Sequence, residues 1–192
     1  MKKIFVLIML ILILASCSMP ETKVYTLSLT PLVSMDNKQA ESSVTLIVHA
    51  PRYLEQPYIA RRVSEYQLEI SRYSKWDSSP ADIVKTTFKN AFSPLFKEVK
   101  IAGYVPEGSY LLDLTLRRFE RIDNGNGSFG ELVFDLKMLS PEGREILKST
   151  VSKSIKLDER DNASLAKALS SALSSAVEEV KNMMSSKLNS KL

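Results

Sequence analysis

The chain is poor in the side chains on which many enzyme sites depend, since it has one cysteine, Cys17, and one histidine, His49. A lone cysteine has no partner for a disulfide within the chain, and these two residues leave only carboxylates as further metal ligands. A Ser-His-Asp triad would have to use His49, whose place at the end of an alternating run beside Pro51 favours a structural or surface role. No carboxylate spacing is typical of a calcium loop. We therefore expect no enzymatic activity, no cofactor and no metal site.

The chain also lacks an apolar run long enough to span a bilayer. The run Ile4–Leu14 would reach about 16 Å as a helix, against the ~30 Å of a bilayer's hydrocarbon core. With the lysines of residues 2–3 before it and small residues after it, this run has the layout of a secretory signal peptide. Residues 14–17, Leu-Ala-Ser-Cys, are similar to the bacterial lipobox. We therefore expect removal of residues 1–16 and attachment of fatty acyl chains such as palmitate to Cys17; the alternative is an ordinary signal peptide with a chance cysteine.

A strongly basic balance is absent from the mature chain. The net charge of +4 falls to +2 when the two lysines of residues 1–16 leave, so charge makes no case for nucleic acid as a partner. We assign residues 17–23 to a lipidated N-terminus and a short tether of at most about 20 Å. Residues 24–192 have the length of a single domain. Ser18 replaces the aspartate that retains lipoproteins in the inner membrane of many Gram-negative bacteria, so we expect an outer-membrane protein that faces the periplasm.

Alternating apolar and polar residues predict strands at 24–29, 44–49 and 65–71. The polar residues 30–43 predict a surface loop. Residues 79–82 combine an N-cap serine, a proline at the first helical position and an acid in the first turn, which predicts a helix that ends before Pro94. The N-terminal half therefore mixes strands with one capped helix.

Residues 109–157 carry the clearest β pattern of the chain. Three alternating runs are separated by turn residues at 123–127 and 140–143, which predicts an antiparallel three-stranded meander. From Asp161 onward apolar residues recur at helical spacing and predict an amphipathic helix. We therefore predict a two-layer α+β fold, in which an antiparallel sheet that includes the meander packs against two main helices. An oligomer interface or a lipid-shielding face is the alternative role for the stripe on the last helix.

Residues 52–76 interleave arginines and a lysine with tyrosines and a tryptophan. On an exported chain this pattern fits core aromatics with solvated arginines, a surface for a protein partner, or a surface for lipid headgroups. The glycine-rich residues 124–127 lack the Lys-Ser/Thr of a phosphate-binding loop, so they predict a hairpin turn.

Several features in a fixed order resemble the ABC-type transport auxiliary lipoproteins, the PqiC-like family encoded with MCE-type lipid transport systems. They are the lipobox, a Tyr-x-Leu strand at 25–27, a strand that runs into residues 51–54, paired arginines at 61–62, and an aromatic stretch before the helix that begins after Ser79. The long 30–43 insertion and the turn at 124–127 depart from the family's pattern. By this resemblance Cys17 is the lipid attachment site. The other matching positions, with a role in the fold or in partner binding, are Tyr25, Leu27, Pro51, Tyr53, Arg62 and Trp76.

The resemblance implies a membrane-anchored, non-catalytic docking component of an MCE-linked ABC-type system that moves lipids across the envelope, with ATP hydrolysis in another subunit. Its partners would be the membrane, through the acylated cysteine, and MCE-type or ABC transporter subunits; a homo-oligomer is left open. Two alternatives are an outer-membrane assembly lipoprotein that chaperones or plugs a β-barrel, and a periplasmic lipid carrier with its own cavity.

Overall fold

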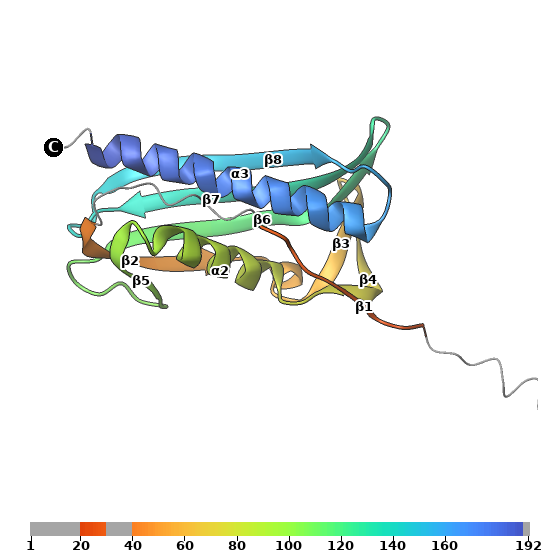
Figure 1. Cartoon of the computed structure of the whole chain (residues 1–192), viewed down its shortest axis with the longest axis horizontal. Helices are drawn as coiled ribbons and strands as arrows, with labels where there is room; N and C mark the ends of the chain where they lie inside the picture. Colours follow the sequence, from red (N-terminus) through yellow and green to blue (C-terminus); the bar gives the residue numbers. More distant parts are fainter. Residues whose placement is uncertain (1–19, 30–39, 190–192) are drawn as a thin grey trace, which may run out of the picture.

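The protein folds into two layers, one eight-stranded sheet and two helices that cover one face of it (Figure 1). The computed structural model describes residues 20–29 and 40–189. The predicted signal peptide, Cys17 and most of the predicted loop at 30–43 lie outside the described residues. No helix in the described part of the chain is long and apolar enough to cross a membrane. The predicted α+β class, with a sheet packed against two main helices, is confirmed.

The elements follow one another in the chain as strands interrupted by one helix and closed by a second. The strands are β1 Lys23–Tyr25, β2 Ala40–His49, β3 Tyr58–Ser64, β4 Gln67–Trp76, β5 Phe96–Ile101, β6 Tyr110–Asn124, β7 Gly127–Leu139 and β8 Glu145–Lys156. The helices are α2 Pro80–Phe92 and α3 Asn162–Asn189, and the short 3-10 helix η1 covers Arg52–Leu54.

The sheet branches along β6. One edge of β6 pairs antiparallel with β7, and β7 pairs antiparallel with β8, which confirms the predicted meander. The other edge of β6 pairs in parallel with β2 through residues 110–115 and with β3 at residues 121–122. From there β2 continues to β5, whereas β3 continues to β4 and β1. We call the branch formed by β3, β4 and β1 the wing.

Local sequence explains both turns of the meander. Between β6 and β7 the Asn124 side chain accepts a hydrogen bond from the backbone N–H of Asn126 at 2.9 Å. Gly127 then takes φ +131°, a conformation that L side chains rarely adopt. Between β7 and β8 the N–H of Gly143 donates to the carbonyl of Ser140 at 2.9 Å, as a four-residue turn requires. The register of the long strands is therefore set by their own turns.

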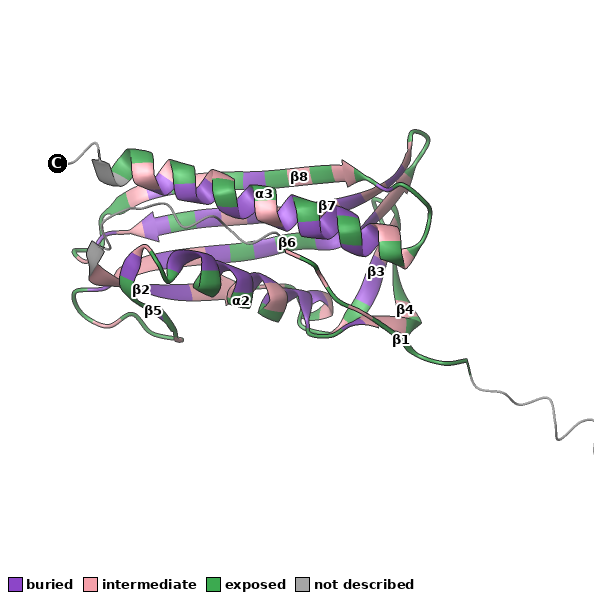
Figure 2. Ribbon diagram, viewed as in Figure 1, coloured by how far each residue is buried: buried purple, intermediate pink, exposed green. Residues whose placement is uncertain are grey.

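Both helices begin where the sequence predicts. The Ser79 hydroxyl oxygen accepts a hydrogen bond from the Asp82 N–H at 3.1 Å, Pro80 is the first helical residue, and α2 ends at Phe92, just before Pro94. In α3, Asp161 accepts from the Ser164 N–H at 2.7 Å in the same way. The apolar stripe of α3 is buried against β7 and β8 (Figure 2). Its members are Leu165, Leu169, Leu173, Ala176, Val177, Val180 and Met184.

The core lies between the helices and the sheet, and aromatic side chains fill its centre. Phe88 of α2 meets Phe134 of β7 edge to face with ring centroids 5.5 Å apart, and Trp76 of β4 meets Phe119 of β6 at 5.6 Å. Gly130 of β7 lets α3 approach closely, because a Cβ there would lie 3.1 Å from the Ala168 Cβ. The wing and the helical layer therefore share one core.

The structure differs from the predicted elements in the N-terminal half. The strand expected at 24–29 shortens to β1, because residues 26–29 leave the sheet and run between the helices. β2 begins inside the predicted loop 30–43, and β4 covers 67–76 where 65–71 was expected. β3 and β5 are absent from the sequence prediction. β3 carries two arginines in its middle and β5 buries every third residue, so neither shows a period of two.

Candidate functional site

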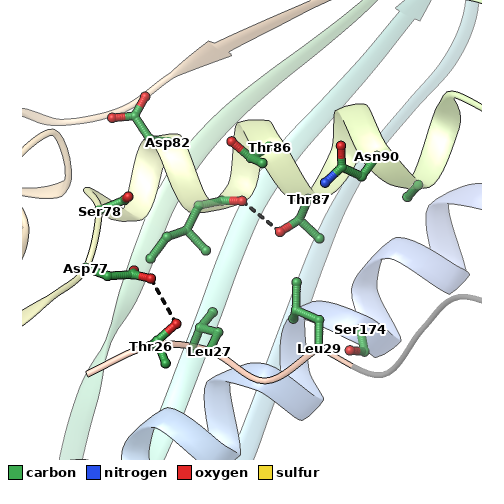
Figure 3. A pocket seen from close by; sticks show the side chains of 12 residues that line it. Thr26, Leu27, Leu29, Asp77, Ser78, Asp82, Thr86, Thr87, Asn90 and Ser174 are labelled. Atoms are coloured by element: carbon green, nitrogen blue, oxygen red, sulfur yellow. Dashed lines mark hydrogen bonds between the residues drawn. The ribbon is translucent and has the colours of Figure 1, made fainter. Parts of the chain in front are cut away.

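The described chain contains a groove between α2 and α3, which we call the interhelix groove (Figure 3). Its volume is about 410 Å³. Residues 26–29, which follow β1, form one wall, and we call this segment the strap. The Leu27 and Leu29 side chains point from the strap toward the two helices. The groove is therefore built by the N-terminal segment as well as by the helical layer.

Polar contacts hold the strap along its length. The Thr26 hydroxyl donates to an Asp77 carboxylate oxygen at 2.9 Å, and the Ser28 N–H donates to the Ser170 hydroxyl oxygen of α3 at 3.1 Å. Just before the strap, the Tyr25 carbonyl accepts a hydrogen bond from the Asp77 N–H at 2.9 Å. These contacts tie the segment to the connection between β4 and α2, and to α3.

The chemistry of the groove is that of hydroxyl, amide and carboxyl groups. Eight of its twelve lining residues are polar, and none is histidine, cysteine or a cation. Asp82, at its edge, has its pKa lowered by hydrogen bonds from Lys85 and Ser79, so it stays ionised and is occupied by those contacts. In the described chain, the one lining hydroxyl bonded to a lining carboxylate is that of Thr26, which donates to Asp77 and so holds the strap in place.

A second feature lies on the sheet face opposite the helices, where three residues from separate elements meet. Glu120 of β6 is fully buried, and one of its carboxylate oxygens accepts a hydrogen bond from Arg62 Nε of β3 at 2.5 Å. The other lies 2.8 Å from the Tyr53 hydroxyl of η1. We call Tyr53, Arg62 and Glu120 the wing cluster. It joins the wing and η1 to the central strand β6.

The electrostatics of the wing cluster follow from burial beside a carboxylate. Burial, and then the neighbouring Glu120 charge, raise the pKa of Tyr53 well above its usual value, so this phenol stays protonated and bonded. The hydrogen bond to Glu120 raises the pKa of Arg62 further. The Arg62 side chain is 22% exposed, whereas the Glu120 side chain is fully buried. The buried carboxylate is thus neutralised by one cation and hydrogen-bonded by one phenol.

The structure brings the sequence-predicted positions together in pairs. Tyr53 and Arg62 meet at Glu120, which the sequence prediction missed because nothing in its local pattern distinguishes it from a solvated strand residue. Tyr25 lies opposite Trp76 in the β1–β4 pairing, and Trp76 is buried with 1% of its surface exposed. Two positions remain: Leu27 lines the interhelix groove, and Pro51 precedes η1, where its carbonyl accepts a hydrogen bond from the Leu54 N–H at 2.8 Å. Cys17 lies outside the described residues.

The remaining candidates for chemistry are isolated. His49 is largely exposed at the end of β2, and its Nε2 lies 3.5 Å from a carboxylate oxygen of Asp113. The described residues contain no group of three or more His, Cys, Asp or Glu side chains that could hold a metal ion. Within residues 52–76, Trp76 is a core residue, whereas Tyr58, Tyr66 and Tyr73 are exposed. The sequence pattern of this segment therefore combines core and surface roles.

Comparison with known proteins assigns the chain to a class and then to a family. A model of auxiliary components of ABC-type transport systems matches residues 25–181, which include every element from the end of β1 to most of α3. Because this match covers most of the chain, the protein belongs to the family of the ABC-type transport auxiliary lipoprotein component. The resemblance inferred from the sequence is confirmed. No curated protein matches the chain.

Solved structures show the same fold at low sequence identity. Protein XCC0632 from Xanthomonas campestris aligns with a TM-score of 0.73 and 18% identity over 88% of this chain and 100% of that one. A second crystal structure, of an uncharacterized protein, aligns with a TM-score of 0.68 and 15% identity over 86% and 99%. Protein CT253 from Chlamydia trachomatis reaches 0.50 and 7% over 76% and 96%. At these identities the likeness concerns the fold alone.

Proposed function

We propose that the protein is the membrane-anchored, non-catalytic docking component of an MCE-linked ABC-type envelope lipid transport system. The observation that carries this proposal is the family match over residues 25–181. The signal-like residues 1–16 and the lipobox-like residues 14–17 support lipid attachment at Cys17. The serine that follows Cys17 supports the outer membrane as the place of anchoring, with the domain in the periplasm.

The position of β1 supports a role at the membrane surface. β1 begins at Lys23, so the chain between Cys17 and the fold spans at most about 20 Å even when fully extended. The strap that follows β1 is bonded to Asp77 and to α3, so the chain is held to the domain from β1 onward. Acyl chains give about 0.8 kcal/mol for each buried methylene, and more than one chain gives stable anchoring. The domain would therefore meet its partners close to the bilayer.

The lining of the interhelix groove bears on the alternative of lipid carriage. Sites that enclose small apolar molecules are lined mostly by apolar and aromatic side chains. Here four of the twelve lining residues are apolar, and two of those belong to the strap that partly fills the groove.

The family-matching positions would act mainly by shaping the domain. Tyr53 and Arg62 hold the wing to β6 through Glu120, and Trp76 packs on Phe119 in the core. Tyr25 pairs beside Trp76. Their common effect would be to fix the wing, and with it the tether strand β1, on the rest of the fold.

The test is recovery of partners from cells that produce a tagged chain. After crosslinking, the tagged protein should co-purify with MCE-type and ABC transporter subunits, and mass spectrometry should find acyl chains on Cys17. Cys17→Ala is the matched control: it should fold, lose the acyl mass and recover far less transporter. Recovery of an outer-membrane barrel protein in place of transporter subunits would support the assembly alternative instead. Phospholipid retained by the purified protein would support the carrier.

A further inference from the structure

One face of the wing carries a row of side chains in register with the tether strand. Val24 of β1 lies opposite Lys75 of β4, and Lys75 lies opposite Tyr58 of β3. Side chains of directly paired residues project to the same face of a sheet, so these three form one row across all three strands of the wing. Val24 is 57% exposed and Tyr58 41% exposed. The next row, Tyr25 and Trp76, points to the other face, where Trp76 joins the core.

A bulge in β4 extends this face. Ala60 pairs with Ile70 and Tyr58 with Lys75, so β4 has several extra residues between these two pairings. The Ser71 hydroxyl oxygen accepts a hydrogen bond from the Ser74 N–H at 3.0 Å, which closes the bulge. Tyr73, inside the bulge, is 46% exposed. Apolar and aromatic side chains are thus exposed beside the strand that leads to the anchor.

The row carries one cation of its own. Lys75 has no ion-pair partner among the described residues, whereas Lys23 and Arg72 alternate with the row along their strands and Glu69 of β4 is bound by Arg61 at 2.9 Å. Tyrosines gather at membrane–water interfaces, where the ring lies among the headgroups and the hydroxyl stays in water. Lysine and arginine extend their apolar stems toward such a surface and place their charge at the lipid phosphates.

We infer that the outer face of the wing, carried by Val24, Tyr58, Tyr73 and Lys75, rests on the surface of the bilayer that holds the lipid-modified Cys17. The inference rests on the proposed anchor, and it adds the orientation of the domain. Pro20, the first described residue, is three residues from Cys17 and so within about 10 Å of it. The wing and the N-terminal segment lie at the same end of the molecule (Figure 1). A tether this short places the nearest exposed apolar face against the headgroups.

The same orientation directs the other end of the sheet away from the membrane. The wing pairs with β6 at Ile122. The last pairing of β5 is with Leu46 of β2, which itself pairs with Leu112 of β6. Leu112 and Ile122 are ten residues apart, or about 33 Å along β6. The connection after β5 carries Tyr104, which is 73% exposed. The domain would therefore present the β5–β6 connection to the periplasm, and Tyr104 is a matched control position for the tyrosines of the wing.

The test measures which tyrosine positions touch lipid in the full, lipid-modified chain. Because acylation blocks Cys17, a single introduced cysteine is the one free thiol for a fluorophore. Tyr58→Cys, Tyr73→Cys and Tyr104→Cys are labelled and placed in vesicles of phosphatidylethanolamine and phosphatidylglycerol whose headgroups carry a nitroxide quencher. The labels at 58 and 73 should lose most of their fluorescence, and the label at 104 should lose almost none. Adding Lys75→Glu should relieve the loss at 58, whereas Lys148→Glu, an exposed change on β8, should not.

Four results would overturn the inference. Equal loss at 58 and 104 would mean that the domain tumbles on its tether, and no loss at either would mean that the wing faces away from lipid. Labelling of the parent chain at Cys17 itself would overturn the anchor, and this orientation with it. An anchored parent chain with unquenched labels at 58 and 73 would instead overturn the orientation alone.

Discussion

The wing cluster offers the sharpest test of how the fold holds its N-terminal branch. Arg62→Met removes the cation that bonds the fully buried Glu120 and leaves its carboxylate with the Tyr53 hydroxyl alone. Removing one partner of a buried ion pair costs about 3–5 kcal/mol, because a charge stays buried without compensation. Since Arg62 is itself 22% exposed and Tyr53 remains bonded, we expect the free energy of unfolding to fall by about 2–4 kcal/mol.

A double-mutant cycle separates the interaction energy between Arg62 and Glu120 from the effect of losing either side chain alone. Combining Arg62→Met with Glu120→Met removes the stranded charge, so the double variant should be more stable than Arg62→Met alone, with a coupling energy of about 2 kcal/mol. The matched control is the pair of Arg118 and Glu131, 2.8 Å apart on neighbouring strands of the same sheet. Because Arg118 is 44% exposed, this pair should couple by less than about 1 kcal/mol.

Urea unfolding monitored by the fluorescence of the single tryptophan, Trp76, suits this measurement, because Trp76 lies in the wing and packs on Phe119. Both cycles should be measured at equal pH and salt, and the slopes of the transitions compared. If the Arg62 and Glu120 cycle gave no more coupling than the Arg118 and Glu131 cycle, the wing would be held by packing and strand pairing. The assigned role of the wing cluster would then be wrong.

Three further predictions concern the helices and the acid range. Gly130→Ala should lower the free energy of unfolding by about 1–3 kcal/mol, because the new methyl would press on α3, whereas Gly125→Ala at an open turn should change it little; urea midpoints measure both. Ser79→Ala should cost about 1 kcal/mol of the same quantity by removing the N-cap of α2. Burial opposes ionisation of Asp123, but hydrogen bonding from Ser128 and nearby arginines hold its pKa below the usual value. Its contribution is therefore present at neutral pH and lost as pH falls below its ordinary pKa, and Asp123→Asn should flatten that decline in acid titrations of thermal stability.

The strap shows what alternation in a sequence does and does not indicate. Residues 24–29 alternate apolar and polar side chains, which predicts an extended chain, and the chain is extended there. Pairing with β4 nevertheless stops at Tyr25, since Leu27 and Leu29 enter the interhelix groove. A strand at a buried face and an extended segment that lines a groove both need apolar side chains at alternate positions. The difference depends on α2 and α3, which the local sequence does not contain.

The candidate site was only partly accessible to sequence reasoning. Tyr53 and Arg62 were recognised from a family-like order, but their shared partner was not, because Glu120 lies 58 residues after Arg62, beyond a bulge in β6 where the alternation of the strand is broken. The basic and aromatic pattern at 52–76 was likewise left open among three roles. Burial assigns these residues different roles: Trp76 is in the core, Arg62 binds a buried acid, and Tyr58, Tyr66 and Tyr73 are exposed.

By itself the sequence determined the parts whose causes are local. The N-cap at Ser79 and the proline at Pro94 fix where α2 begins and ends. Turn residues fix the pairing of the meander, and the helical spacing of apolar residues predicts α3. The first residues predict export and a lipid anchor. Tertiary structure alone decided that one edge of β6 pairs with both β2 and the wing, and that the buried carboxylate of Glu120 joins the wing to β6. These depend on contacts between residues far apart in the chain, whose free energy appears only when the whole core closes around them.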